Sequence, residues 1–132
     1  MPPPVQSGGA RAKPVILAVD DSPISLHALS AVLSAEYAVH ALAEPARLEE
    51  ALDRVTPDLI LLDYHMPGRN GIECIPAIRR RPECLQTPIL LVTSLSTMSS
   101  LLDAMRYGVS GFLVKPVPPE VLKLNVAKHL RR

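Results

Sequence analysis

Acidic, hydroxyl and basic side chains follow four separate apolar runs of this sequence. Asp20 and Asp21 come directly after the run VILAV, and Asp63 comes directly after LILL. Thr93 follows the run ILLV, and Lys115 follows FLV. Short apolar runs of this kind are typical of the buried strands of a parallel sheet. Because the carboxyl ends of parallel strands lie at one edge of the sheet, we expect these five side chains to meet there.

Three carboxylates brought within a few ångströms of one another repel strongly. At about 4 Å and an effective dielectric constant of about 20, each contact costs on the order of 4 kcal/mol. Lys115 supplies one positive charge, and a hard divalent cation fits the oxygen ligands. Mg²⁺ in particular takes one or two carboxylates together with waters and phosphate oxygens. Acids, a hydroxyl and an ammonium group around a phosphoryl group form a phosphoryl-transfer arrangement, so the pattern predicts that chemistry, with Asp63 as its central residue.

Each of these residues also has a purely structural explanation. Two acids before Ser22 and Pro23 fit a helix start, because serine is a common N-cap and proline is favoured in the first turn. An acid at a strand end is often only solvated, and a lone threonine or lysine there carries little information. The functional interpretation depends on the joint pattern, in which every strand but the weakly alternating one at 37–42 ends in a residue suited to the same chemistry.

Strand and helix patterns alternate along the whole chain. Strands are expected at 15–19, 37–42, 59–62, 89–92 and 112–114, with a helical pattern after each of them. This repeated βα order predicts an α/β fold with a parallel sheet, right-handed crossovers and helices on both faces. Pro76 falls inside the third helix, where a proline removes a backbone hydrogen bond, so we expect that helix to be kinked or short.

Apolar spacing gives two of these helices an expected core-facing stripe. The stripe of the first helix comprises Ile24, Ala28, Leu29, Val32 and Leu33, and that of the fourth comprises Met98, Leu101, Leu102 and Met105. Exposure of the second set would instead mark a surface for a partner.

Composition bounds the class of protein. A chain of 132 residues with 48% apolar and 20% charged residues fits one globular domain. A net charge of +1 gives no electrostatic reason to expect nucleic acid or an anionic membrane as a partner. No apolar run reaches the roughly 18 residues of a membrane span, and the N-terminus lacks the apolar segment of a signal peptide, so we expect a cytoplasmic protein.

The N-terminal segment and the cysteines are expected to carry no chemistry. Residues 1–13 are rich in proline, glycine and small residues, and we interpret them as a disordered leader before a domain at 14–132. Cys74 and Cys84 do not have the spacing of a zinc site, and we expect both to be small buried hydrophobes.

Four ordered segments of the chain resemble the receiver domain of bacterial two-component response regulators, of the chemotaxis-receiver type. The segments are VDDSP, LILLDYHMPGRNG, LVTS and GFLVKP, and the resemblance covers about residues 14–130. It implies a single doubly wound, flavodoxin-like (βα)₅ domain whose five-stranded parallel sheet has the strand order 2-1-3-4-5.

The resemblance also implies a role for each candidate residue. Asp63 would accept a phosphoryl group from the phosphohistidine of a sensor histidine kinase. Asp20, Asp21, Asp63 and the backbone carbonyl of His65 would hold Mg²⁺. Such a domain is regulatory and is not an enzyme, because it catalyses only its own phosphorylation and dephosphorylation.

The remaining implied roles concern the response to the phosphoryl group. Thr93 and Lys115 would contact the phosphoryl oxygens, and Phe112 would be the switch aromatic that turns inward when Thr93 moves. The Lys115–Pro116 peptide bond is expected to be cis. The face formed by the fourth helix, the fifth strand and the fifth helix would bind a second copy or an output domain, and receivers often continue into such a domain in a longer parent chain. Neither nucleic acid nor membrane is an expected partner of the domain itself.

Two positions depart from the family pattern. His65 lies two residues after the phosphoacceptor and Leu95 lies two residues after Thr93, and both flank the path of an attacking water. Our hypothesis is that they set the lifetime of the acyl phosphate, with a plain exposed loop histidine as the alternative for His65.

Three other classes of protein are alternatives to a receiver domain. A haloacid-dehalogenase-like Mg²⁺-dependent phosphatase needs an Asp-x-Asp pattern on its first strand, whereas Asp20 and Asp21 are adjacent here. A flavodoxin-like cofactor binder needs a phosphate loop rich in serine and threonine, which DDSPIS does not supply. A receiver-like interaction module that is never phosphorylated should have lost part of the site, which is intact in this sequence.

Overall fold

Five strands and five α-helices alternate in the part of the chain that the structure, a computed structural model, describes: residues 13–94 and 98–130. The strands are β1 (Val15–Val19), β2 (Ala38–Leu42), β3 (Leu59–Asp63), β4 (Ile89–Thr93) and β5 (Gly111–Val114). The helices are α1 (Pro23–Leu33), α2 (Leu48–Arg54), α3 (Gly71–Arg79), α4 (Met98–Arg106) and α5 (Pro119–Leu130), with short 3₁₀ turns η2 (Pro45–Arg47) and η3 (Pro82–Cys84). The expected leader at 1–13 lies outside the described residues except for Lys13.

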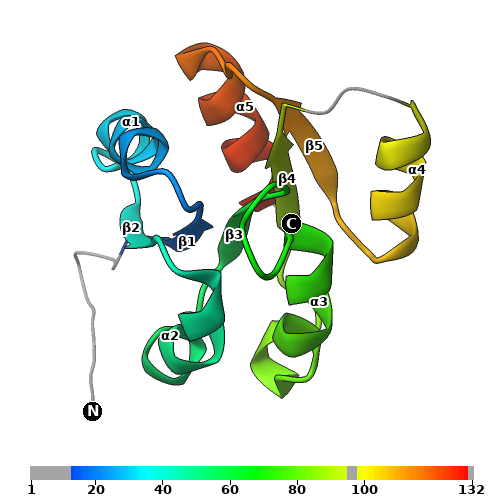
Figure 1. Cartoon of the computed structure of the whole chain (residues 1–132). Helices are drawn as coiled ribbons and strands as arrows, with labels where there is room; N and C mark the ends of the chain where they lie inside the picture. Colours follow the sequence, from blue (N-terminus) through cyan, green and yellow to red (C-terminus); the bar gives the residue numbers. More distant parts are fainter. Residues whose placement is uncertain (1–12, 95–97, 131–132) are drawn as a thin grey trace.

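All strand pairs are parallel, and the strand order is β2-β1-β3-β4-β5. Helices α1 and α5 cover one face of the sheet, and α2, α3 and α4 cover the other (Figure 1). The central strands β3 and β4 are buried along their whole length, as a sheet covered on both faces requires. The predicted doubly wound fold and its strand order are therefore confirmed.

Alternate residues of each strand feed two separate hydrophobic cores. Leu17 and Val19 of β1 belong to the core under α2, α3 and α4. Ile16 and Ala18 of the same strand belong to the core under α1 and α5. This period of two lets a continuous apolar run such as VILAV bury side chains on both faces of the sheet, and all but the first residue of this run are buried. The strand ends are thereby fixed in depth, and the residues that follow them emerge at a common edge.

Helix α1 begins as predicted. Three members of its expected stripe face the core, since Leu33 is buried and Leu29 and Val32 pack against the core under α1 and α5, but the other two members are exposed. The Ser22 hydroxyl accepts a hydrogen bond from the backbone N–H of Ser25, and Pro23 occupies the first turn. Leu26 and Leu33 are buried, whereas Ile24 is 83% exposed. Residues two apart on a helix point to nearly opposite sides, so burial of Leu26 turns Ile24 outward. The expectation was also wrong for Ala28, which is exposed.

Helix α3 is short and carries Pro76 on its exposed side. A capping box starts it: the N–H of Glu73 donates to Asn70 Oδ1 and the N–H of Asn70 donates to Glu73 Oε1. The helix ends three residues after Pro76, at Arg79. The sequence predicted that this helix would be either kinked or short, and the structure confirms that it is short.

Cys74 and Cys84 are both buried and unbridged, as predicted. Burial raises the pKa of the Cys74 thiol to about 11, which keeps it protonated and unreactive. Among the described residues, no helix combines the length and the apolar character that crossing a membrane requires.

Candidate functional site

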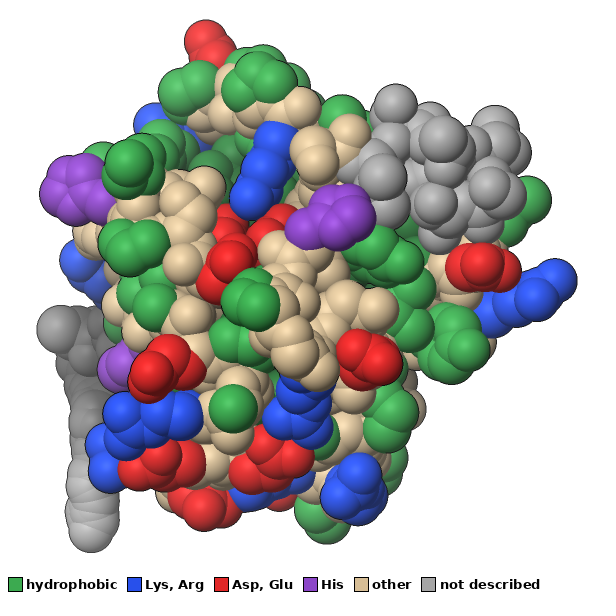
Figure 2. Space-filling view, viewed as in Figure 1, with side chains coloured by type: hydrophobic (Ala, Val, Ile, Leu, Met, Phe, Trp, Pro, Cys, Tyr) green, Lys and Arg blue, Asp and Glu red, His purple; other side chains and the backbone are tan. Residues whose placement is uncertain are grey.

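Three carboxylates converge at the carboxyl edge of the sheet. Asp20 and Asp21 follow β1, and Asp63 is the last residue of β3. One carboxylate oxygen from each lies within 4.8 Å of the others, and we call these three residues the acidic cluster. Asp20 is 2% and Asp63 5% exposed, while Asp21 is open to solvent. Figure 2 shows acidic side chains in a hollow near the middle of this face, below a basic side chain and beside a histidine.

Lys115 bridges the two buried members of the acidic cluster. Its Nζ lies 2.9 Å from Asp20 Oδ2 and 3.2 Å from Asp63 Oδ1. Burial by itself lowers the pKa of this ammonium group, but the hydrogen bonds and negative charges of Asp20 and Asp63 together outweigh burial, so the pKa is raised. Lys115 therefore stays charged and compensates part of the repulsion between the carboxylates.

The backbone at the end of β1 fixes the orientation of Asp20. Its Oδ1 accepts a hydrogen bond of 2.9 Å from the N–H of Ser22, while Oδ2 accepts from Lys115. The N–H of Asp20 donates to the carbonyl of Leu42 on β2. Because both carboxylate oxygens are engaged, the side chain is held toward the cluster.

Asp63 remains short of positive charge in the absence of a cation. Burial raises the pKa of its carboxyl, and the charge of Asp20 raises it further, against the opposing effect of Lys115. One ammonium group is thus insufficient for three carboxylates. All three potential ligands are carboxylate oxygens, and the cluster is open to solvent on the side of Asp21. Both features fit Mg²⁺, which prefers carboxylate ligands and keeps several of its waters.

Thr93 and Phe112 lie where the sequence predicts them. Thr93 ends β4, is buried, and its carbonyl accepts a hydrogen bond of 2.8 Å from the N–H of Lys115. Phe112, on the neighbouring strand β5, is half-buried and packs against the core under α2, α3 and α4. The Lys115–Pro116 peptide bond is cis, as expected.

The loop of residues 64–70, the β3–α3 loop, carries the departure from the family pattern. His65 is exposed, and its ring meets the ring of Tyr64 edge to face at a centroid distance of 4.9 Å. Tyr64 itself packs against the core, so the ring of His65 contacts a side chain that is held in place. Leu95, the other departure, lies outside the described residues.

Gly71 is a site residue that the sequence analysis missed. A Cβ atom at this position would lie 2.5 Å from the backbone oxygen of Asp63, closer than two such atoms can approach. The N–H of Gly71 donates to the carbonyl of Tyr64 and closes the β3–α3 loop. Only a residue without a side chain lets α3 start so close to the end of β3. No local pattern in the sequence indicates what this glycine contacts.

The expected core stripe of α4 was wrong for the two members that can be assessed. Leu102 and Met105 are each more than half exposed. Among residues 102–106, the part of this helix whose side chains the structure describes, Ala104 is buried and belongs to the core under α2, α3 and α4. The side chain at this contact is thus a small one, and the larger Leu102 and Met105 point outward. Together with Val114 on β5 and Val121 and Leu124 on α5, they form an exposed apolar set that we call the partner face.

Comparisons with known proteins agree with this geometry. Residues 16–127 match the family model described as the response regulator receiver domain. The chain is 33% identical over 75 residues to the chemotaxis protein CheY of Pseudomonas aeruginosa, a match over 57% of this chain and 60% of CheY. It is 35% identical over 118 residues to the response regulator PleD of Caulobacter vibrioides, a match over 88% of this chain but only 26% of PleD.

A solved structure shows the same fold. The structure of the chemotaxis protein CheY4 of Vibrio cholerae superimposes with a TM-score of 0.85 at 30% identity, covering 89% of this chain and 99% of CheY4. The chain thus spans less than two thirds of the two curated relatives described above, and nearly all of this structural neighbour.

Gly71→Ala should destabilise the protein by about 1–3 kcal/mol, because the new methyl group must displace the Asp63 backbone. The free energy of unfolding in urea measures the loss. Gly111→Ala is the matched control, since its Cβ would meet only movable side chains, at 3.2 Å from Leu90 and 3.5 Å from His129. Equal stability of the two variants would contradict the close contact.

Asp63→Asn should stabilise the cation-free protein at neutral pH. A carboxyl whose pKa is higher in the folded state gives its full stability below the unfolded pKa and loses it as pH rises through the folded pKa. We expect a gain on the order of 1 kcal/mol near neutral pH in EDTA, shrinking toward zero below about pH 4.

The exposed Asp103→Asn provides the control for this substitution. Saturating Mg²⁺ should reverse the order by stabilising the parent protein alone. An Asp63→Asn variant that is less stable than the parent near neutral pH in EDTA would rule out charge strain at this residue.

Proposed function

This chain belongs to the response regulator receiver domain family of two-component systems, and from that premise we propose that Asp63 is its phosphoacceptor. The observation that carries the proposal is the position of Asp63. It ends the central strand β3, is 5% exposed, and lies within 4.8 Å of two other carboxylates and 3.2 Å from an ammonium group. Such a domain is regulatory, and it passes a signal between a kinase and an output.

The proposed reaction moves a phosphoryl group from phosphohistidine to a carboxylate. An Asp63 oxygen attacks the phosphorus atom, the P–N bond to the donor imidazole breaks, and an acyl phosphate O–P bond forms. The imidazole leaves with its electron pair and takes up a proton from water. Attack needs the ionised carboxylate, and the charge of Lys115, 3.2 Å away, favours that form.

The proposed cation is Mg²⁺, held by Asp20, Asp21, Asp63 and the backbone carbonyl of His65. When bound, it neutralises the carboxylates and the incoming phosphoryl oxygens. The residues of this chain then orient the acceptor: Asp20 is fixed by Ser22 and Lys115, and Asp63 is backed by Gly71. Lys115 and Thr93 are proposed to contact the phosphoryl oxygens after transfer.

Phosphorylation is proposed to act through Thr93 and Phe112 on the partner face. The modification adds roughly two negative charges beside Lys115. A shift of Thr93 toward these charges would open space for Phe112, which now lies half-buried on the next strand. Phe112 lies on β5, next to the exposed Val114 of the partner face. We propose that this face binds a second copy of the chain or an output domain, and that a sensor histidine kinase supplies the phosphoryl group.

The test is to incubate the protein with Mg²⁺ and acetyl phosphate and to measure its intact mass. One phosphoryl adduct should form on the parent protein. It should disappear in EDTA and in Asp63→Asn, because the acceptor oxygen and the cation are both required. The exposed Asp103→Asn should be phosphorylated like the parent. Absence of an adduct on the parent, or its persistence in Asp63→Asn, would overturn the proposal.

His65 is proposed to set the lifetime of the acyl phosphate, because its exposed ring lies two residues after the acceptor and is supported by Tyr64. We expect His65→Ala to slow dephosphorylation several-fold, well below the roughly 10²-fold of a full general base. Loss of the adduct over time after removal of the donor gives the rate. His40→Ala, another exposed histidine, is the control. An unchanged rate in His65→Ala would leave the ring without a role in hydrolysis.

A further inference from the structure

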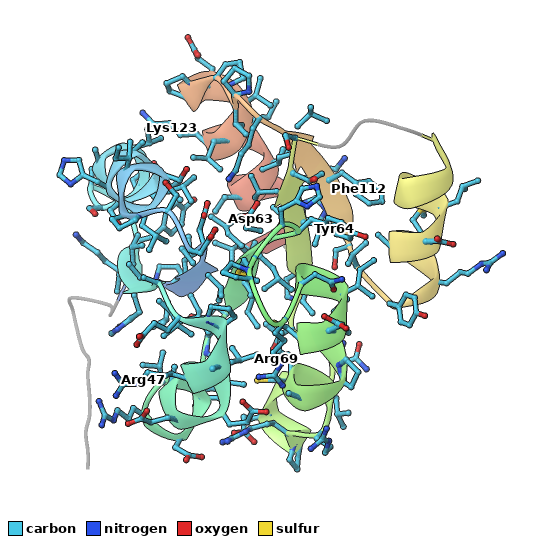
Figure 3. The ribbon with its side chains drawn as sticks, in the orientation of Figure 1. Arg47, Asp63, Tyr64, Arg69, Phe112 and Lys123 are labelled. Carbon is cyan, nitrogen blue, oxygen red and sulfur yellow. The ribbon has the colours of Figure 1, made fainter. Side chains whose placement is uncertain are left out.

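Two arginines, one before the start of α3 and one after its end, form hydrogen bonds and ion pairs with helix α2. Arg69, in the β3–α3 loop, donates two parallel hydrogen bonds to the Glu49 carboxylate, with distances of 2.9 Å to Oε1 and 2.8 Å to Oε2. Arg81, beyond the end of α3, donates to the backbone carbonyl of Glu49 at 2.9 Å and pairs with Asp53 at 2.6 Å. Figure 3 shows Arg69 between α2 and α3. Glu49 is therefore held by its side chain and by its backbone.

The Arg69–Glu49 contact is geometrically specific. A guanidinium fork on a carboxylate fixes direction as well as distance, unlike a single ammonium contact. Arg69 also donates to the carbonyl of Pro45, the buried first residue of η2, at 3.2 Å. Only 25% of the Arg69 side chain is exposed. The hydrogen bonds from Arg69 lower the pKa of Glu49 to about 2, so the pair stays ionised throughout the physiological pH range.

The β3–α3 loop has anchors at three levels. At its base, the N–H of Gly71 donates to the carbonyl of Tyr64. In its middle, Met66 is buried in the core. Pro67 and Gly68 are exposed, and Gly68 has a positive φ of 79°, so the backbone turns away from the core there. Arg69 then ties this outer part of the loop back to α2.

The loop leads directly to the proposed phosphorylation site. Asn70, the next residue after Arg69, caps α3 through Glu73. Gly71 follows, and it lies against the backbone oxygen of Asp63. His65, whose carbonyl is a proposed cation ligand, is next to the buried Met66. A displacement of Arg69 would therefore move two groups of the site. It would move Asp63 through the cap of α3, and it would move the His65 carbonyl through the loop.

We propose that the Arg69–Glu49 ion pair is a positioning device for the cation site, fixing the β3–α3 loop so that the His65 carbonyl and Asp63 are presented together. The proposal rests on the proposed function of the acidic cluster. Arg69 and Glu49 are positioning residues, because they act through the loop and contact neither the acidic cluster nor a bound phosphoryl group directly.

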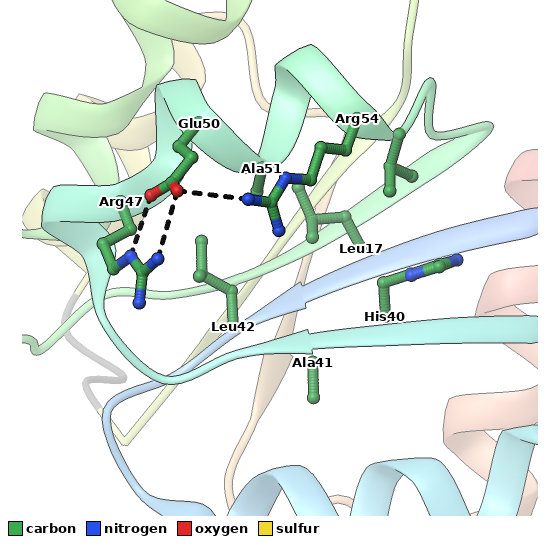
Figure 4. Close-up of a pocket in the computed structure, with 9 residues that line it drawn as sticks. Leu17, His40, Ala41, Leu42, Arg47, Glu50, Ala51 and Arg54 are labelled. Carbon is green, nitrogen blue, oxygen red and sulfur yellow. Dashed lines mark hydrogen bonds and ion pairs between the residues drawn. The ribbon is translucent and has the colours of Figure 1, made fainter.

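The chain supplies a closely matched control in the adjacent residue Glu50. The side chains of Glu49 and Glu50 are each 46% exposed, and both pair with arginine. Glu50 pairs with Arg47 at 2.8 Å and with Arg54 at 3.4 Å, beside β2 and away from the loop (Figure 4). Replacing either glutamate by glutamine removes the same charge at nearly the same place, so any difference reports on the Arg69 contact.

The experiment compares Glu49→Gln with Glu50→Gln by calorimetric titration with Mg²⁺ and by hydrogen exchange of residues 64–71. Loss of a group that hydrogen-bonds directly to a metal ligand typically costs roughly 10–100-fold in affinity. For a contact that acts through a loop, we expect Glu49→Gln to raise the Mg²⁺ dissociation constant about three- to ten-fold. It should also speed exchange in the loop. Glu50→Gln should stay within about two-fold of the parent.

A charge-swapped protein, with Glu49→Arg and Arg69→Glu together, should recover most of the lost affinity. Equal Mg²⁺ affinity of Glu49→Gln and Glu50→Gln, or equal weakening of both, would overturn the inference while leaving the proposed function intact. A parent protein that binds no Mg²⁺ and forms no phosphoryl adduct would overturn both.

Discussion

The repulsion among buried carboxylates is the constraint on which the rest of this structure depends. Asp20 and Asp63 are nearly inaccessible to water, and Asp21 completes a set of oxygens within 4.8 Å. Lys115 relieves part of the repulsion but leaves the pKa of Asp63 raised. Such an arrangement stores electrostatic free energy that a cation or a phosphoryl group beside that cation can release. A binding event at one edge of the sheet therefore changes the stability of the whole domain.

Packing of the sheet against the helices holds these charged residues together despite their repulsion. The central strands β3 and β4 are buried along their whole length, and alternate residues of the strands that end at the site enter two cores on opposite faces. The strand ends are thus held by packing that does not involve the charges themselves. Gly71 and the β3–α3 loop extend this support to the backbone of Asp63, and the ion pair between Arg69 and Glu49 connects the loop to α2.

Two surfaces next to the site have different proposed roles, one in receiving the phosphoryl group and the other in binding a partner. The acidic cluster opens toward solvent at Asp21, where a phosphoryl donor can approach. The partner face on α4, β5 and α5 exposes large apolar side chains whose free exposure is unfavourable without a partner. Thr93 at the end of β4 is paired with Val114 of β5, the strand that also carries Phe112, so two neighbouring strands connect the two regions. The proposed phosphoacceptor and the partner face are therefore joined through neighbouring strands of one sheet.

Local residue patterns were enough to predict the alternation of strands and helices, the residues at the strand ends and the start of α1, because short apolar runs and N-caps act locally. The amino-acid sequence gives these features without knowledge of the packing. It also placed Asp20, Asp21, Asp63, Thr93 and Lys115 at one edge, because parallel strands share a direction. The tertiary structure was needed to show that Ile24 of α1 and Leu102 and Met105 of α4 point outward, since the apolar spacing of these helices was compatible with more than one buried face. It alone revealed Gly71 against Asp63 and Arg69 on Glu49. These contacts join residues that local periodicity does not relate, and packing between elements fixes them.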